Sequence, residues 1–233
     1  MNPKEIALKT AQKRREAVSA LRDTGLAAQQ RAEELRRKRQ GQTQVLQAKA
    51  EEQEILSWDI PGLFPTPPDL ADRMVYIAML GVGLQQGDSV LEPSAGTGNI
   101  AQAIQRGGYR PVCVEVNYTL AERLRKQGFD TYCENFLEFR RGEFKAIIMN
   151  PPFERQQDID HVYHAWGLLR ANGRLVAIIS EGTFFRSDSK AREFRGWLEN
   201  WKHDIETLPK DTFKSVGTSV ASRLVIIDNL RRD

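Results

Sequence analysis

The sequence predicts an α/β fold in which a largely parallel β-sheet carries helices on both faces. From Trp58 onward, apolar strand-like runs alternate with helix-like segments, and loops rich in glycine and proline separate them. The length of 233 residues suffices for one such core plus an appendage. All nineteen aromatic residues lie at Trp58 or later, so we expect the core there, in a domain spanning 58–233.

Each expected element follows from a local pattern of apolar residues and breaks. Gly128 and Gly173 are expected to close the second and third helices. The last strand is expected at the far side of the sheet. The predicted strands are 89–93, 111–116, 131–133, 144–149, 174–179 and 223–227, and the predicted helices are 99–106, 119–127 and 161–170.

Residues 1–57 are expected to form a basic helical extension. Residues 1–50 hold twelve Lys and Arg against five Asp and Glu, and they are rich in good helix formers. The run Arg36–Arg39 fits either a solvated helix face or a contact with nucleic-acid phosphates, and charge alone does not choose. A partner protein or a second copy of the chain could also bind through this segment.

Composition also indicates in which cellular compartment the protein is expected. No apolar run approaches the roughly 18 residues that a membrane span requires, and the amino terminus has no signal-peptide apolar region. Cys113 and Cys133 are too few and too widely spaced for a zinc knuckle or a disulfide scaffold. We therefore expect a soluble cytoplasmic protein without a membrane partner.

A glycine loop between a predicted strand and a predicted helix indicates a nucleotide-like ligand. Gly96 and Gly98 let the backbone approach a ligand closely, and the amides of the following helix add partial positive charge. Glu115 ends the next strand, nineteen positions after Gly96, where a carboxylate can accept both hydroxyls of a ribose. With Ala101 in third place the loop also satisfies a loose dinucleotide pattern, so an NAD enzyme stays open at this point.

The segment Asn150-Pro151-Pro152-Phe153 follows an apolar strand directly and points to a different chemistry. Two prolines remove backbone donors and hold the chain extended, which leaves the Pro151 carbonyl without an internal partner. Beside it stand the Asn150 amide and the flat face of Phe153, a combination that suits a planar substrate bearing an amine. Acceptors on both amine hydrogens localise the nitrogen lone pair. Alignment of this nitrogen with a sulfonium methyl group then promotes methyl transfer through proximity. This chemistry needs no metal, and NAD chemistry has no use for the segment.

These motifs together resemble those of class I S-adenosylmethionine-dependent methyltransferases, and most closely the DNA adenine-N6 methyltransferases of phages, plasmids and bacteria. The resemblance covers about 60–230 and implies a Rossmann-like sheet. Leu91–Gly98 matches the cofactor loop of the family, and Asn150–Phe153 matches its catalytic motif. Phe64–Pro68 resembles the first cofactor-contacting motif. The cofactor-binding residues that the resemblance implies in these two segments are Phe64, Thr66, Glu92, Ser94, Ala95, Gly96 and Gly98.

Further roles carry over position by position. Glu115 would hold the cofactor ribose. Asn135-Phe136 stands where the family usually has Asp-Phe, whose first residue contacts the cofactor adenine and whose second packs on it. Asn135 departs from that pattern because it supplies no charge. Asn150 and the Pro151 carbonyl would bind the target N6, behind the rigid Pro152, with Phe153 stacking on the base.

The resemblance implies methyl transfer from S-adenosylmethionine to the N6 amine of adenine in DNA, with S-adenosylhomocysteine as the product. The base must leave a duplex or be offered single-stranded. No separate target-recognition domain is expected, so sequence reading would fall to 1–57, to the loops 181–196 and 208–220, or to a partner. Methylation of an RNA amine or of protein glutamine is the alternative, and an inactive protein that binds cofactor and nucleic acid is a second one.

Several other residues have two open interpretations. His161 and His164 could begin a metal site, although no third ligand is evident, or they could pack as ordinary helix residues or form a rim that faces the substrate. Either Phe184 or Phe185 could line the base pocket, or both could belong to the core. The basic residues of the predicted 181–196 region fit phosphate contacts or a solvated face; they are Lys190, Arg192 and Arg195.

Overall fold

The computed structural model describes residues 62–214 and 220–231, together with Ile60 and scattered positions between 31 and 55. Contacts divide the chain into two units, Met1–Ser57 and Trp58–Asp233. The described residues of the first unit are helical, and Arg36–Arg39 are exposed among them. The rest of the predicted extension lies outside the described residues, as does most of the expected polar loop at 214–219, so both stay predictions.

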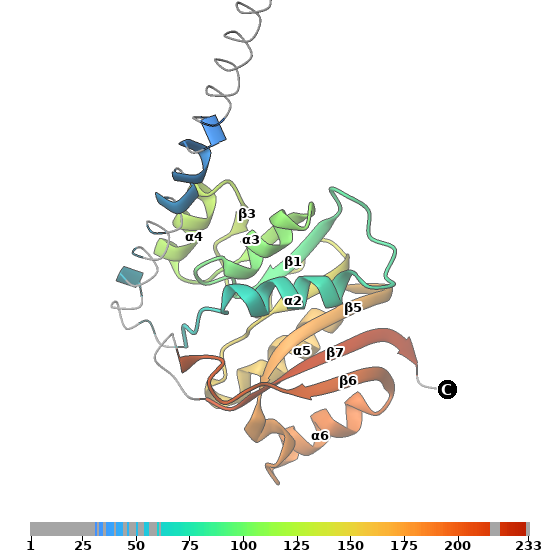
Figure 1. Cartoon of the computed structure of the whole chain (residues 1–233). Helices are drawn as coiled ribbons and strands as arrows, with labels where there is room; N and C mark the ends of the chain where they lie inside the picture. The colour runs from blue at the N-terminus through green and yellow to red at the C-terminus, as the bar shows by residue number, and fades with distance from the viewer. Residues whose placement is uncertain are drawn as a thin grey trace, which may run out of the picture. The chain divides into compact units, whose positions relative to one another are not determined.

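The second unit contains a seven-stranded sheet with the order β3-β2-β1-β4-β5-β7-β6 in the described part of the chain (Figure 1). The first five strands run parallel, and β7 runs antiparallel to both β5 and β6. The strands are β1 (Ser89–Pro93), β2 (Arg110–Val114), β3 (Asp130–Tyr132), β4 (Phe144–Met149), β5 (Leu169–Ser180), β6 (Trp201–Thr207) and β7 (Ser222–Arg231). The predicted α/β fold with a largely parallel sheet is confirmed.

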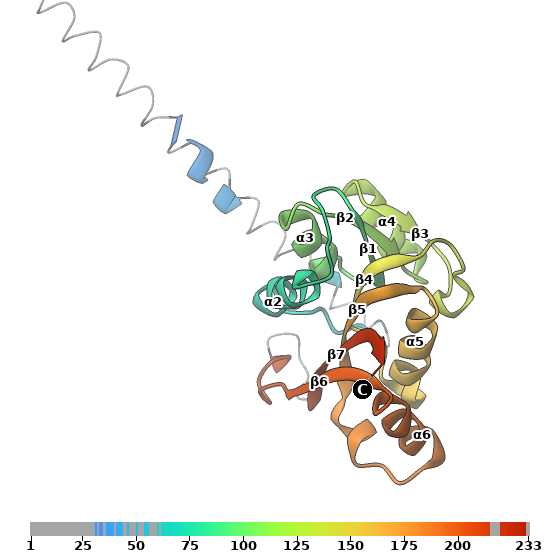
Figure 2. The same ribbon diagram turned by 90° about the vertical axis from the view of Figure 1, so that its right-hand side faces the viewer.

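Helices cover both faces of this sheet (Figure 2). The helices are α2 (Pro68–Met79), α3 (Asn99–Arg106), α4 (Tyr118–Lys126), α5 (Gln157–Trp166) and α6 (Ser189–Leu198), with 3-10 turns η1 (Phe136–Glu138), η2 (Glu154–Gln156) and η3 (Glu181–Phe184). Successive side chains of β4 point to opposite faces of the sheet. Ala146 and Ile148 pack with the helices α2 and α3, whereas Ile147 and Met149 pack with the helices α5 and α6. Among the described residues, no helix is both long and apolar enough to cross a bilayer.

The third predicted helix ends earlier than expected. It was expected to run to Arg170 and to close at Gly173, but α5 stops at Trp166 and β5 begins at Leu169. Gly173 instead lies in a bulge, where β5 advances five residues while β4 advances two. A Cβ on Gly173 would lie 2.8 Å from the Lys145 carbonyl oxygen, so glycine is required there by close approach of two strands.

The far side of the sheet also differs from the prediction. The late strand β7 lies between β5 and β6, and β6, which the sequence did not indicate, forms the edge. Along β6 only Trp201 and Ile205 are large apolar residues, so its pattern is weak. An edge strand needs only one partner, and here β7 supplies it through antiparallel pairing.

One partly buried ion pair holds α2 against the sheet, and α2 follows directly on the Phe64–Pro68 motif. Arg174 on β5 binds Asp228 on β7 through two nitrogen–oxygen contacts of 2.6 and 3.0 Å. The same guanidinium donates to the carbonyl oxygens of Ile77 and Leu80, at 2.9 and 2.8 Å, and so caps the end of α2. This contact fixes where the motif ahead of α2 lies relative to the strands.

Gly98 is the N-cap of α3 and has a φ of 85°, and a Cβ there would lie 2.6 Å from Leu124 Cδ2. Gly128 has a similar φ of 88° with nothing within 4 Å of such a Cβ, so it is a matched control. Both alanine substitutions carry the backbone cost of a left-handed residue, but only Gly98→Ala adds a clash. We expect Gly98→Ala to lower the free energy of unfolding by about 1–3 kcal/mol more than Gly128→Ala, measured by denaturant unfolding. Equal losses would contradict the close packing of α3 on α4.

Candidate active site

A cavity of about 470 Å³ opens at the carboxyl ends of the parallel strands, where α/β sheets bind their ligands. Eleven of the fourteen predicted site residues line it: Phe64, Thr66, Glu92, Ser94, Ala95, Gly96, Glu115, Asn135, Phe136, Asn150 and Pro152. A second cavity of similar volume lies at the amino ends of the strands, and no predicted site residue lines it. The sequence motifs therefore converge on the first cavity.

The glycine loop binds the Glu115 carboxylate through its backbone. Gly96 N–H donates to Glu115 Oε2 and Asn117 N–H donates to Oε1, both at 2.8 Å. Burial raises the pKa of Glu115, although these backbone donors oppose the rise. Each carboxylate oxygen has a second acceptor position. The carboxylate is thus held in one orientation and can still accept hydroxyl groups from the cavity.

Glu92 stands at the end of β1 and is almost fully buried. Desolvation raises the pKa of its carboxyl group well above the usual range, and the nearby Glu115 adds to the rise. Its Oε2 lies 3.8 Å from Cys113 Sγ, which donates to it. A cationic group entering the cavity would favour the ionised form of Glu92, so this carboxyl responds to the charge of the ligand.

Asn135 and Phe136 lie at the β3 side of the cavity. Asn135 Oδ1 accepts from Leu137 N–H at 3.1 Å and so caps η1, which occupies its only side-chain acceptor atom in a local contact. The Phe136 ring is buried, 5.3 Å from the His161 ring and 4.8 Å from the His164 ring. These contacts place the aromatic ring of the predicted pair firmly against α5.

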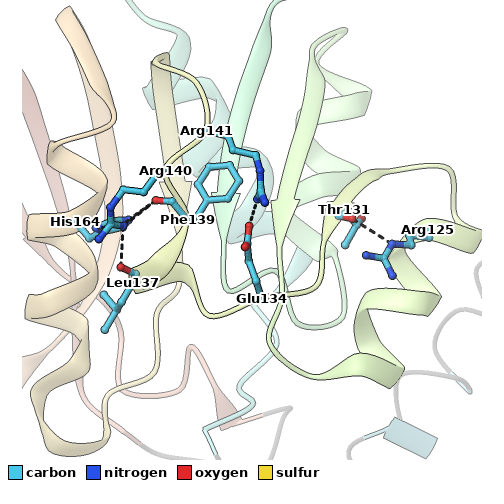
Figure 3. A network of polar contacts seen from close by, with 8 residues as sticks. All are labelled: Arg125, Thr131, Glu134, Leu137, Phe139, Arg140, Arg141 and His164. Atoms are coloured by element: carbon cyan, nitrogen blue, oxygen red, sulfur yellow. Dashed lines mark hydrogen bonds and ion pairs between the residues drawn. The ribbon is translucent and has the colours of Figure 1, made fainter.

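A polar network fixes the chain that follows Phe136 (Figure 3). His164 Nε2 lies 2.8 Å from the Phe139 carbonyl oxygen, and Arg140 donates to the Leu137 carbonyl oxygen at 2.8 Å. Arg141 pairs with Glu134, and its guanidinium lies 4.8 Å from the centre of the Tyr132 ring. His164 is therefore engaged with the backbone of this segment, while His161 contacts Ser94 of the glycine loop.

Asn150 is held by the motif that precedes α2. Its Nδ2 donates to the Phe64 carbonyl oxygen at 2.8 Å and to Thr66 Oγ1 at 3.2 Å. Because a backbone carbonyl oxygen can only accept, the nitrogen of the side chain must face Phe64, and the O/N assignment follows from chemistry. Within the described residues, no donor reaches Asn150 Oδ1. Both amide hydrogens are used, and the oxygen is left for a ligand.

Thr66 joins this amide to the helix that follows the glycine loop. Its own carbonyl oxygen accepts from Asn99 Nδ2 at 2.8 Å, and Asn99 is the first residue of α3. Thr66 is almost fully buried. One residue therefore connects the start of α3 with the side chain at the end of β4.

Three predicted site residues do not line the cavity. Gly98 is the N-cap of α3 and packs beneath Leu124. Pro151 is buried, and Phe153 is half-buried against the apolar cluster that contains α2 and α3. The predicted stacking of Phe153 on a base and the predicted role of the Pro151 carbonyl stay predictions.

His161 lines the cavity, which is one of the positions that sequence analysis left open for it. Its Nδ1 lies 3.2 Å from Ser94 Oγ, and Ser94 has a left-handed φ of 58°. Burial lowers the pKa of His161 to about 4, so the ring is neutral near pH 7. Gln157, four residues earlier on the same helix face, also lines the cavity.

Comparison with known proteins identifies the fold. No family model and no curated protein matches the sequence. Among solved structures, the methyltransferase subunit of a type I restriction-modification system from Streptococcus thermophilus is similar over 75% of this chain, with a TM-score of 0.59 and 18% identity. This chain spans 46% of that subunit, which is less than half its length.

Two further structures agree with this result. A class I S-adenosylmethionine-dependent methyltransferase from Listeria monocytogenes, described as putative, matches 72% of this chain and 61% of its own, with 14% identity and a TM-score of 0.57. The 23S rRNA methyltransferase ErmE matches 73% of this chain and 70% of its own, with 16% identity and a TM-score of 0.55. The second unit therefore has the α/β class I methyltransferase fold.

Burial of neutral His161 predicts a pH dependence of stability. Between about pH 6.5 and about pH 4 the unfolded chain binds a proton that folded His161 does not, so acidification lowers the free energy of unfolding. We expect the wild type to lose about 2 kcal/mol relative to His161→Gln between about pH 6.5 and about pH 5, measured by denaturant unfolding. The raised pKa values of the buried acids make acidification stabilise the folded chain. Because both proteins contain these acids, their effect on stability cancels in the comparison. Parallel curves for the two proteins would contradict a neutral buried imidazole.

Proposed function

We propose that this chain transfers a methyl group from S-adenosylmethionine to the exocyclic N6 amine of adenine in DNA. The observation that carries the proposal is Asn150, whose two amide hydrogens are bound by Phe64 and Thr66 so that its oxygen is left as an acceptor in the cavity. An acceptor presented beside a glycine loop and a ribose-binding carboxylate suits an amine substrate next to a nucleoside cofactor.

The cavity fits the proposed cofactor by size and by donor set. Its volume of about 470 Å³ lies within the usual range for small-molecule sites. Glu115 would accept the ribose hydroxyls, and Phe136 would pack on the adenine. Glu92 offers a carboxyl group to the ammonium of the methionine part, and ionisation on binding would offset its burial. S-adenosylmethionine supplies an electrophilic methyl group on a sulfonium sulfur.

The residues of the chain act on the target amine by acceptance and alignment. The Asn150 oxygen, with the Pro151 carbonyl as second acceptor, would hold the two amine hydrogens and turn the nitrogen lone pair toward the methyl group. A nitrogen–carbon bond forms as the carbon–sulfur bond breaks, and one amine proton then leaves. An amide oxygen is a weak base, so Asn150 positions the amine and the proton passes to water.

DNA is favoured as the substrate by two observations. The motif set of the sequence resembles the DNA adenine-N6 enzymes, and a similar solved structure is the methyltransferase subunit of a restriction-modification system. RNA is the second candidate, because the rRNA methyltransferase ErmE shares the fold at comparable similarity.

The test is transfer of labelled methyl from S-adenosylmethionine to unmethylated duplex DNA, single-stranded DNA and RNA, followed by digestion to nucleosides. N6-methyladenine in DNA is the expected product. Label confined to RNA would replace the substrate with the second candidate. No label in any nucleic acid, despite measurable binding of S-adenosylhomocysteine, would overturn the proposal and direct attention to protein glutamine.

Asn150→Ala removes the acceptor and should lower kcat by about 100-fold or more, because a preorganised polar contact to the reacting group is lost. Asn150→Asp should also fail, since a carboxylate cannot donate to the Phe64 carbonyl oxygen and faces it at close range. Methyl-transfer kinetics give kcat, and calorimetry with S-adenosylhomocysteine checks that the cofactor site is intact. Near-normal activity of Asn150→Asp would contradict the proposed orientation of the amide.

Thr66→Val deletes the hydroxyl that accepts from Asn150 while keeping the shape of the side chain. We expect kcat to fall about five- to tenfold, the value of one hydrogen bond, with little change in KM for DNA. Thr66→Ser keeps the hydroxyl and should restore most of kcat. If both variants are equally impaired, or if only KM changes, Thr66 does not act through Asn150.

A further inference from the structure

The turn after β5 carries two adjacent phenylalanines with opposite surroundings. Phe184 is half-buried and packs against the apolar cluster of α5 and α6. Phe185, one residue further, is 70% exposed. A single exposed aromatic is ordinary on a protein surface, so its meaning depends on what holds it and what lies beside it.

Polar contacts from α5 and α6 hold this turn in place. Asp158 Oδ2 on α5 accepts from Ser180 N–H at 3.0 Å and from the Thr183 hydroxyl at 3.3 Å. Arg195 on α6 donates to the carbonyl oxygens of Thr183 and Arg186, at 2.7 and 3.0 Å. The turn is therefore tied to both neighbouring helices.

A third contact orients the ring itself. Arg223 on β7 binds Glu181 through both carboxylate oxygens, at 2.7 and 2.9 Å. Its guanidinium carbon lies 4.7 Å from the centre of the Phe184 ring and 5.1 Å from that of Phe185. An exposed aromatic ring on such a fixed turn loses little conformational entropy when it binds a partner.

This turn adjoins the chain that follows Asn150–Phe153. Arg155 and Gln156 have left-handed φ values of 53° and 59°, which is strained backbone for residues with side chains. Gln156 hydrogen-bonds Asp188, the N-cap of α6, and Lys190 of α6 binds Asp160 of α5 at 2.6 Å. Because β4 and β5 are parallel neighbours, both turns lie at the cavity edge of the sheet.

Each of the two turns carries one exposed arginine, Arg155 in η2 and Arg186 directly after Phe185. Arg155 and Arg186 are exposed, and in the described part of the chain their guanidinium groups make no hydrogen bond or ion pair. Of the nearby acids, Glu181 binds Arg223, whereas Asp188 caps Ala191 N–H at 3.1 Å and is also attracted by the charge of Arg186. The Glu154 carboxylate lies against Gly62, where a Cβ would come within 2.8 Å of it.

We propose that Phe185, Arg155 and Arg186 form the DNA-binding rim of the active site. Phe185 stacks on a base next to the target adenine, and the two arginines contact the flanking phosphates. Stacking on an aromatic ring combined with cationic phosphate contacts is how proteins hold unstacked nucleotides. The inference rests on the proposed function, because it takes DNA as the substrate. It also chooses Phe185 over Phe184 as the base-contacting residue.

Binding of a fluorescein-labelled DNA duplex by the full chain, with saturating S-adenosylhomocysteine, tests the rim. Phe185→Ala and Phe185→Leu should weaken binding about tenfold, whereas Phe185→Trp should stay within about twofold of wild type. Tyr76→Ala is the matched control, since Tyr76 on α2 is 66% exposed and lies outside the rim. Arg155→Gln and Arg186→Gln should each reduce the salt slope of binding by about 0.9.

The outcomes separate this inference from the proposed function. If the wild type methylates DNA while Phe185→Ala and Phe185→Leu bind like the control, the rim is overturned and the function stands. If only an RNA oligonucleotide of the same sequence shows the expected pattern, DNA is overturned as the partner. If the wild type binds and methylates no nucleic acid, both fail. Unchanged affinity for S-adenosylhomocysteine in each variant confirms that the fold is intact.

Discussion

The candidate active site depends on one hydrogen-bonded group, the Asn150 carboxamide held by Phe64 and Thr66. An amide side chain can present either end to a ligand, and only the surrounding acceptors decide which one. Here two oxygens from a distant segment bind the nitrogen, so the oxygen is presented to the cavity. The same segment binds Asn99 at the start of α3. Three parts of the chain, separated in sequence, are therefore aligned by contacts that converge on Thr66.

The fold supports this alignment from further away. Phe64 and Thr66 lead directly into α2, and Arg174 fixes the far end of that helix while it binds Asp228. The order of strands places the end of β4 beside β1, where the glycine loop begins, and Glu115 closes β2 on the other side. Displacement of α2 would move the acceptors of Asn150 as well. The position of α2 on the sheet thus determines which end of the Asn150 amide faces the cavity.

Much of this was predictable because it is local in the sequence. The glycine loop, Glu115 and Asn150 each follow a strand, and parallel strands bring their carboxyl ends to one edge. The rest depends on tertiary contacts. His161 reaches the cavity because α5 packs behind Phe136, and Phe153 packs in part against the cluster of α2 and α3, while its stacking on a base stays a prediction. The edge strand β6 was missed because its apolar pattern is sparse, and pairing with β7 decides its conformation.

The most direct test of the account is the NMR signal of the Asn150 side-chain amide, assigned by its loss in Asn150→Ala. The account predicts two resolved amide protons that exchange slowly with solvent, because one binds the Phe64 carbonyl oxygen and the other binds the Thr66 hydroxyl. In Thr66→Val one of them should shift and exchange faster, while the other is retained. A freely exchanging amide that does not respond to the Thr66 substitution would contradict the central claim.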